Sequence, residues 1–237
     1  MERFSASAAS RHMSCHASAN LEVAIEGWHP PVEDKDKDNA ANRGTMMHAL
    51  FAGVMGLTPR EQKNFISAIE YIGELTSGRR FKKLIEEPVR AEWLSTRPGT
   101  TADLVLYTRD ELHIVDLKTG RTPVDPVYNT QLMFYALCYA DRAPAAKGAT
   151  LHVVQPAADN ITSWFATTAD LKAFMNDAIT EHDAIQQGDV TFGVSDHCTF
   201  CPANPRGRGE KGTPYCPEIM QLYYPTVVDE AALLEGE

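Results

Sequence analysis

The alternation of apolar and polar residues predicts a chain in which helices surround a group of short strands. Apolar residues recur at helical spacing from about residue 58, with Pro59 in the first turn, to near Gly78. The same kind of pattern predicts other helices, over residues 41–55, 127–139 and 169–187. Extended segments are predicted over residues 84–94, 101–107, 112–118, 150–155 and 161–166. This order of helices and strands indicates an α/β or α+β fold.

Three regions follow from the spacing of these elements. The first, residues 1–40, begins with a small, polar helix start and ends in a charged loop that contains two adjacent prolines. The second, residues 41–190, holds all the strands, and a short turn within it predicts an antiparallel hairpin of segments 101–107 and 112–118. The third, residues 191–237, is rich in Cys, Pro and Gly and has little regular pattern.

Composition narrows the class of protein. The 237 residues are 43% hydrophobic and 23% charged, which is an ordinary globular balance. A net charge of −10 excludes a uniformly basic nucleic-acid coat, although it is compatible with a nuclease whose acidic site holds metal. The apolar runs are too short to cross a bilayer, and no secretory signal is visible. We therefore expect no membrane partner. Five cysteines are an odd and sparse number that makes a poor disulfide framework, so we expect the protein to lie in a reducing cytoplasm.

The predicted hairpin carries an acidic pair with a lysine. Asp103 and Asp116 lie at facing ends of its two strands, where they could share a hard divalent cation. Lys118 is two residues beyond Asp116 and therefore projects from the same strand face, where it could act on a metal-bound water. The chain contains four acid-x-Lys triplets, but only this one ends an apolar, β-rich segment. The other three are better explained as solvated charge pairs.

Four other residues could contribute to such a site. His48 lies on a predicted helix and could be a metal ligand, although a lone helical histidine is more often structural. Gln131 and Tyr135 share one helix face and could contact a phosphate or a base, although a buried aromatic is an equally good explanation. Glu87, or its neighbour Glu86, could position the metal or the water.

In order and spacing, these motifs resemble the RecB-type branch of the PD-(D/E)XK nucleases. The resemblance covers roughly residues 40–140 and rests on the motifs Gly44…His48, Gly99-Thr-Thr-Ala-Asp103, Val115-Asp-Leu-Lys-Thr-Gly120 and Gln131-x3-Tyr135. Ala102 stands where the family name has its proline. The resemblance implies a restriction-endonuclease-like core, with a central mixed sheet flanked by helices, and DNA cleavage that depends on Mg²⁺ or Mn²⁺.

The resemblance also assigns roles to the motif residues. It implies that His48, Asp103, Asp116 and the Leu117 carbonyl bind the metal, while Lys118 acts on the attacking water. It also gives Gln131 and Tyr135 a role in binding DNA. Apart from the resemblance, Glu87 is a candidate catalytic residue and Arg121, in the loop after Lys118, is a candidate DNA contact.

The third region contains Cys198-x2-Cys201-x14-Cys216, which is typical of a metal-binding segment. A zinc site would need a fourth ligand, for which His197, His16 and Cys15 are candidates. Three C-terminal cysteines with one distant N-terminal cysteine resemble the iron-sulfur staple of AddB-type and CRISPR-associated RecB-like nucleases. That resemblance implies a 4Fe-4S cluster on Cys15, Cys198, Cys201 and Cys216, with zinc as the alternative. Cys138 is predicted to be buried.

Two basic runs are candidates for DNA contact. Residues 79–83 read better as a solvated face, whereas Arg206, Arg208 and Lys211 lie within the cysteine segment, where a cluster would anchor them. The predicted function is a DNA exonuclease, with endonuclease activity as the near alternative. Similarity to phage-encoded RecB-like proteins implies a role in recombination, repair or end processing in the cytoplasm of a bacterial host, beside a single-strand annealing recombinase. The alternative of another class is a non-catalytic DNA-binding or scaffold module with structural zinc.

Overall fold

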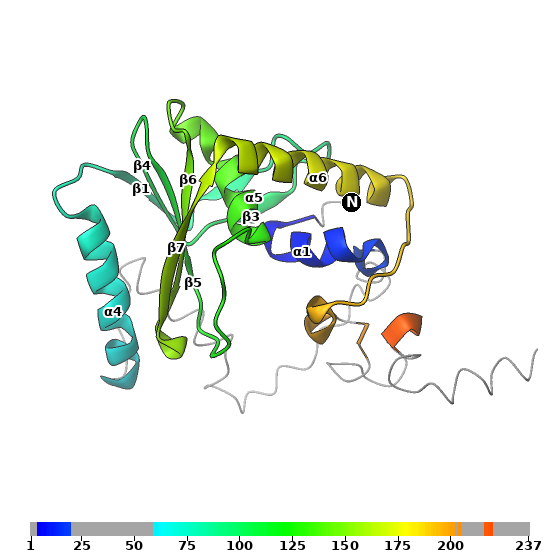
Figure 1. Cartoon of the computed structure of the whole chain (residues 1–237), viewed down its shortest axis with the longest axis horizontal. Coiled ribbons are helices and arrows are strands. Elements are labelled where there is room, and N and C mark those ends of the chain that lie inside the picture. Colours follow the sequence, from blue (N-terminus) through cyan, green and yellow to red (C-terminus); the bar gives the residue numbers. More distant parts are fainter. Residues whose placement is uncertain (1–3, 20–58, 202, 205–215, 220–237) are drawn as a thin grey trace, which may run out of the picture.

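A five-stranded mixed sheet forms the centre of the computed structural model, which describes residues 4–19, 59–201, 203–204 and 216–219 (Figure 1). Its strands, in spatial order, are β1 (Lys82–Ile85), β4 (Leu104–Tyr107), β5 (Leu112–Leu117), β6 (Gly148–Gln155) and β7 (Asn160–Thr167). Only β5 and β6 are parallel, and the other neighbouring pairs are antiparallel. All six residues of β5 are buried, as expected for a central strand.

Helices cover both faces of the sheet (Figure 1). The helices α1 (Ala6–Ser14), α5 (Thr130–Cys138) and α6 (Thr168–Gln186) lie on one face and α4 (Pro59–Thr76) lies on the other. The larger core fills the first face and includes Ile114, Leu151 and Phe134, whereas Val115 and Val154 belong to the smaller core beneath α4. Short 3-10 turns span Ala140–Arg142, Pro156–Ala158 and Asp196–Phe200. The predicted fold class, with a central mixed sheet flanked by helices, is confirmed.

Local sequence signals explain where α5 and α6 begin. The side chain of Asn129 accepts a hydrogen bond from the Leu132 N–H at the start of α5. At the start of α6, Thr167 and Asp170 form a reciprocal capping box. The predicted starts of these helices, residues 127 and 169, lie within three residues of the observed ones. The hairpin of β4 and β5 is also confirmed.

The prediction of two continuous extended segments before β5 was wrong. Residues 84–94 divide into β1 and β2 (Pro88–Arg90), and residues 101–107 divide into β3 (Gly99–Thr101) and β4. The two short strands β2 and β3 pair in a separate sheet. The chain leaves β1 at Glu86, which has a φ of 47°, and the Glu86 N–H bonds the Asp103 carbonyl. Asp103 therefore lies at a break between strands.

Two further sequence predictions concern a helix and the absence of a membrane span. The helix predicted over residues 41–55 lies outside the described residues. Among the residues that the structure does describe, no helix is long and apolar enough to span a membrane.

A buried histidine pair lies between the sheet and α4. His152 on β6 is 2% exposed, and its Nδ1 is 2.7 Å from the Tyr71 hydroxyl of α4. Its Nε2 is 3.0 Å from Nδ1 of His113 on β5. Burial, followed by the neighbouring His113, lowers the pKa of His152 to about 3, and burial also lowers the pKa of His113. Both rings are therefore neutral in the folded protein near pH 7.

We expect this pair to make the fold sensitive to acid. Below its ordinary pKa of about 6.5, the His152 ring takes up a proton in the unfolded chain. The folded chain resists protonation until about pH 3, so the stabilisation is complete above pH 6.5 and falls as the pH drops toward 3. Between pH 7 and pH 5, one such histidine should lower the free energy of unfolding by about 2 kcal/mol. Urea unfolding across this range should show that the free energy of unfolding falls more steeply for the wild type than for His152→Gln. Equal falls would show that His152 is not the source of the acid sensitivity.

Candidate active site

Asp103 and Asp116 face each other across the open end of the β4–β5 hairpin. The register pairs Leu104 with Val115, which places Asp103 directly opposite Asp116. Both carboxylates are buried, at 7% and 3% exposure. Oδ2 of Asp103 accepts a hydrogen bond of 2.6 Å from the backbone N–H of Leu117. The strand pairing therefore brings together the two acidic residues singled out in the sequence.

Lys118 links this acidic pair to helix α5. Its Nζ is 2.9 Å from Oδ2 of Asp116 and donates to Oε1 of Gln131 at 2.8 Å. Nε2 of Gln131 donates in turn to the Tyr135 hydroxyl at 2.9 Å. The backbone N–H of Lys118 donates to the Val154 carbonyl, which continues the pairing of β5 with β6 beyond the end of the strand. Four residues predicted to act together thus form one continuous chain of polar contacts.

Tyr135 is held in its neutral form by this environment. Burial raises the pKa of its hydroxyl well above the usual range, and the charges of Asp116 and Asp103 raise it further, against the opposing hydrogen bonds to Gln131 and Thr100. The phenol is therefore available as a hydrogen-bonding group and not as a base. The contact with Thr100 of β3 was not anticipated from the sequence.

The donor chemistry of the carboxylate pair fits a hard divalent cation. Mg²⁺ prefers oxygen ligands and is commonly bound by one or two carboxylates while it keeps several waters. Among the residues that the structure describes, no group of three or more His, Cys, Asp or Glu side chains could hold a metal ion. Asp103 and Asp116 would supply two ligands, and the predicted ligand His48 lies outside the described residues.

The other predicted site residues have more exposed positions. Glu87 is exposed between β1 and β2, where its carbonyl accepts a hydrogen bond of 2.6 Å from the Tyr139 hydroxyl. Arg121 is exposed in the segment after β5. Arg206, Arg208 and Lys211 lie outside the described residues.

Gln155, which has no distinctive sequence pattern, fixes the segment that follows Lys118. Its side chain is 1% exposed and its Nε2 donates to the carbonyls of Gly120 at 2.9 Å and Thr122 at 2.7 Å. Its Oε1 accepts from the Val124 N–H at 3.0 Å and from the amide of Asn160. The available signal was a lone amide side chain at the end of an apolar strand.

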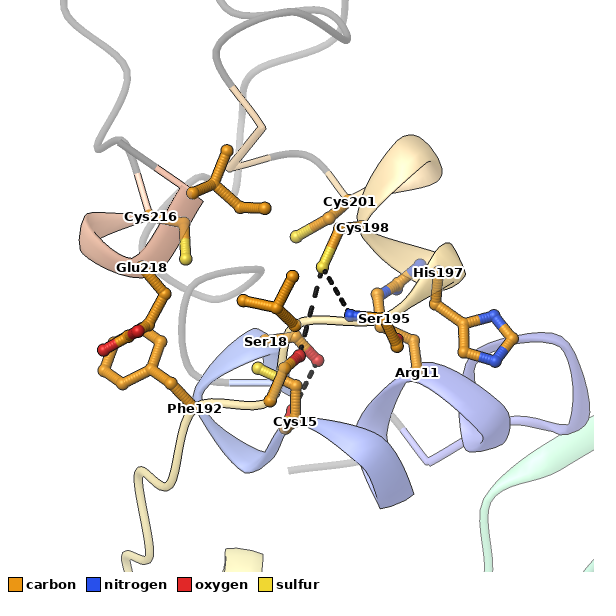
Figure 2. A pocket seen from close by; sticks show the side chains of 13 residues that line it. Arg11, Cys15, Ser18, Phe192, Ser195, His197, Cys198, Cys201, Cys216 and Glu218 are labelled. Atoms are coloured by element: carbon orange, nitrogen blue, oxygen red, sulfur yellow. Dashed lines mark hydrogen bonds between the residues drawn. The ribbon is translucent and has the colours of Figure 1, made fainter. Parts of the chain in front are cut away.

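A second group of residues lines a pocket between the chain ends. Figure 2 shows Cys15, which directly follows α1, across from Cys198, Cys201 and Cys216 in the C-terminal segment. Gly193 lies so close to α1 that a Cβ there would meet the Ser14 carbonyl oxygen at 1.8 Å. The Thr191 carbonyl also accepts a hydrogen bond from the Ala17 N–H. The two ends of the described chain are therefore in direct contact, and the four predicted cluster cysteines surround one space.

Electrostatics distinguish this pocket from an ordinary apolar one. Burial raises the pKa of Cys201, and the nearby Cys198 and Cys216 raise it further, while Arg11 opposes these effects. Arg11 lies near enough to Cys15 and Cys201 for their charges to raise its pKa against the larger effect of burial. The buried Arg11 therefore gives the pocket a cation, although the raised pKa values of Cys201 and Cys216 favour their neutral thiols in the metal-free chain.

The histidines considered as zinc ligands bond elsewhere. Nε2 of His197 is 2.6 Å from the hydroxyl of Ser10, and His16 lies between Glu181 and Asp189. Cys138 is buried in the main core, as predicted, and burial raises its pKa to about 12.

Comparison with known proteins gives one family match and several similar structures. The model of the family described as "Protein of unknown function (DUF2800)" matches residues 67–212. A solved structure described as "Putative exonuclease", from Eubacterium rectale, is 16% identical, with a TM-score of 0.54 over 94% of this chain and 93% of that chain. An alkaline exonuclease from Laribacter hongkongensis is 10% identical, with a TM-score of 0.32 over 75% of this chain and 93% of that chain. At these identities, the similarity to the first structure establishes a shared fold.

Proposed function

The chain belongs to the family described as DUF2800, and we propose that it is a metal-dependent deoxyribonuclease of the RecB-like PD-(D/E)XK kind. The observation that carries this proposal is the contact chain from Asp116 through Lys118 and Gln131 to Tyr135, with Asp103 directly opposite. A purely structural role would not require two buried carboxylates side by side, because burying like charges is unfavourable. The fold shared with the Eubacterium rectale protein, which is described as a "Putative exonuclease", supports the proposal.

We assign Asp103 and Asp116 as ligands of Mg²⁺ or Mn²⁺. The remaining protein ligands would be His48 and the Leu117 carbonyl. When bound, the metal would polarise the scissile phosphate and lower the pKa of a water molecule. The N–H of Leu117 already orients the Asp103 carboxylate, so this ligand is in place before any cation arrives. Glu87, on the exposed rim, is proposed to help position the water.

Lys118 is positioned to act on the attacking water. Its Nζ lies between a carboxylate and an amide oxygen, so it can hold a water against a phosphate beside Asp116. The neutral Tyr135 hydroxyl and the Gln131 amide can donate hydrogen bonds to phosphate oxygens of the bound strand. Arg121, Arg206, Arg208 and Lys211 are proposed to contact the DNA backbone farther from the site.

The mode of cleavage can be tested on defined substrates. We favour an exonuclease, for which linear DNA should be degraded from an end in Mg²⁺ or Mn²⁺, with no product in EDTA. Strands labelled separately at each end should give time courses that identify the polarity, and covalently closed circular DNA should resist. Rapid nicking or linearisation of closed circles would indicate an endonuclease. Failure of the purified chain to cut any of these substrates in either metal would refute the nuclease proposal.

We further propose that the four cysteines hold a 4Fe-4S cluster that joins the chain ends. All four cysteines line one pocket, but no three of the described His, Cys, Asp or Glu side chains converge closely enough to hold a single ion. This favours a four-iron cluster, whose thiolates bind separate irons, over zinc, which needs four ligands about 2.1–2.3 Å from one point. The Ser195 N–H already donates to Sγ of Cys198, a contact that commonly tunes cluster sulfur. A role in phage recombination beside an annealing recombinase remains part of the proposal and rests on the sequence resemblance.

A further inference from the structure

An exposed aromatic side chain lies in the segment between the proposed catalytic lysine and α5. Tyr128 is 65% exposed, and its backbone has a φ of 50°. Bulky residues rarely adopt this left-handed conformation, which costs of the order of 1–3 kcal/mol. Such strain persists only where the surrounding structure imposes it, and burial of the ring does not explain it here.

Hydrogen bonds on both sides of Tyr128 fix its conformation. Upstream, the buried Gln155 side chain binds the backbone at Gly120, Thr122 and Val124. Closer by, Oδ1 of Asp125 accepts from the Val127 N–H at 2.9 Å, and the Asn129 side-chain amide donates to the Asp125 carbonyl at 3.1 Å. The segment is therefore anchored to the sheet and to the start of α5, and it holds the tyrosine ring outward.

Trp164 of β7 supports the Tyr128 ring from one side. The two ring centroids are 4.7 Å apart, with planes tilted by 49°. Trp164 is itself partly buried against the main core. The Tyr128 hydroxyl also hydrogen-bonds the side chain of Asp170 at the start of α6. Tyr128 is thus a rigid aromatic surface with one supported side and a large solvent-exposed area.

This surface lies on the same side of the sheet as the acidic pair. Asp116 pairs with Val153 of β6, which pairs with Thr162 of β7, and Trp164 is two residues farther along that strand. Residues two apart on a strand share a face. From strand spacing, the Cα atoms of Asp116 and Trp164 are about 12 Å apart. A short stretch of one DNA strand can span that distance.

We propose that Tyr128, supported by Trp164, is a stacking site for an unpaired base of a DNA strand bound at Asp103 and Asp116. This inference rests on the proposed nuclease function. It adds that part of the DNA substrate is single-stranded where it passes Tyr128. Exposed aromatic rings bind single strands because every base offers a flat face, whereas bases in a duplex already stack on each other. Arg121 is exposed on the same segment, seven residues before Tyr128, and would be available to a phosphate of the bound strand.

Binding can be tested without cleavage. Fluorescence anisotropy in Ca²⁺, an oxygen-binding cation that can occupy the carboxylate pair in place of Mg²⁺, would measure the affinity of the full chain for a labelled, cleavage-resistant phosphorothioate single strand of about twelve nucleotides. Tyr128→Asn removes the ring, and asparagine tolerates the left-handed backbone, so folding is preserved. We expect this variant to bind at least about fivefold more weakly. Tyr128→Phe, which keeps the ring, should bind like the wild type.

Phe165 provides a matched control. It is 50% exposed and adjacent to Trp164 in sequence, but it lies on the opposite face of the sheet. Phe165→Ala should leave affinity unchanged. The inference is overturned if Tyr128→Asn binds as tightly as the wild type, if Phe165→Ala weakens binding equally, or if the wild type does not bind the strand.

The binding result is separable from the proposed catalysis. If the wild type binds through Tyr128 yet cuts no DNA in Mg²⁺ or Mn²⁺, the nuclease proposal fails and the stacking site stands. If DNA is cut but Tyr128→Asn binds normally, the stacking site fails and the nuclease proposal stands.

Discussion

Replacing Asp116 with asparagine is expected to lower metal-dependent DNA cleavage by at least about 10³-fold. Asparagine has nearly the same shape, so the variant should fit the buried position at the end of β5. It removes the negative charge that would hold the cation and that now pairs with Lys118 at 2.9 Å. Both the metal and the lysine would lose their common partner, and for this reason we expect a loss in turnover that more metal does not restore.

The control for this variant lies on the same hairpin. Asp110 is an exposed acid in the turn at the opposite end, where it accepts a hydrogen bond from Thr108. Asp110→Asn removes the same charge from the same hairpin and should leave cleavage within about twofold of the wild type, as surface substitutions usually do. Initial rates on labelled linear DNA would measure both variants, and thermal unfolding would verify that each is folded. Equal rates for Asp116→Asn and the wild type would contradict the proposed role.

The second large effect is expected at Cys15. Protein purified without oxygen should contain a 4Fe-4S cluster and absorb visible light, and Cys15→Ala should lose most of its iron. Cys15 directly follows α1, whereas its three proposed partners lie in the C-terminal segment, so the substitution also breaks the tie between the two ends. Because a structural metal site contributes folding free energy, we expect the melting temperature to fall by about 10 °C.

Cys138 is the matched control for this experiment. It is the fifth cysteine of the chain and is buried in the main core. Cys138→Ala should keep the iron content of the wild type, although the smaller side chain costs some stability. Iron and sulfide analysis with visible absorption would measure both variants. Colourless wild-type protein with one zinc ion per chain would contradict the cluster proposal, and iron retained in Cys15→Ala would contradict its ligand set.

Local periodicity was sufficient to predict which side chains of the candidate site lie beside one another. The two-residue period of a strand placed Asp116 and Lys118 on one face, and the observed ion pair agrees with that placement. The helical period placed Gln131 beside Tyr135, and their side chains are hydrogen-bonded. A hairpin with a short turn fixes which residues face each other, which explains why Asp103 could be placed opposite Asp116.

Features that depend on distant contacts could not be predicted in the same way. The break at Glu86 involves a left-handed backbone at a glutamate and a hydrogen bond to the Asp103 carbonyl, neither of which has a local signature. Gln155 acts through backbone groups more than thirty residues earlier in the chain. Its role depends on β6 lying beside β5, and the pairing of those strands is not encoded in either strand alone.

We propose above that the Asp103–Asp116 pair supports metal-dependent hydrolysis of DNA. The most direct test of this claim is the release of labelled nucleotides from linear DNA by the full chain, compared in Mg²⁺, Mn²⁺ and EDTA beside identically purified Asp116→Asn. We predict release by the wild type in one or both metals, none in EDTA, and almost none from the variant. Release that persists in EDTA, release that is equal in the variant, or no release by the wild type in either metal would contradict the claim.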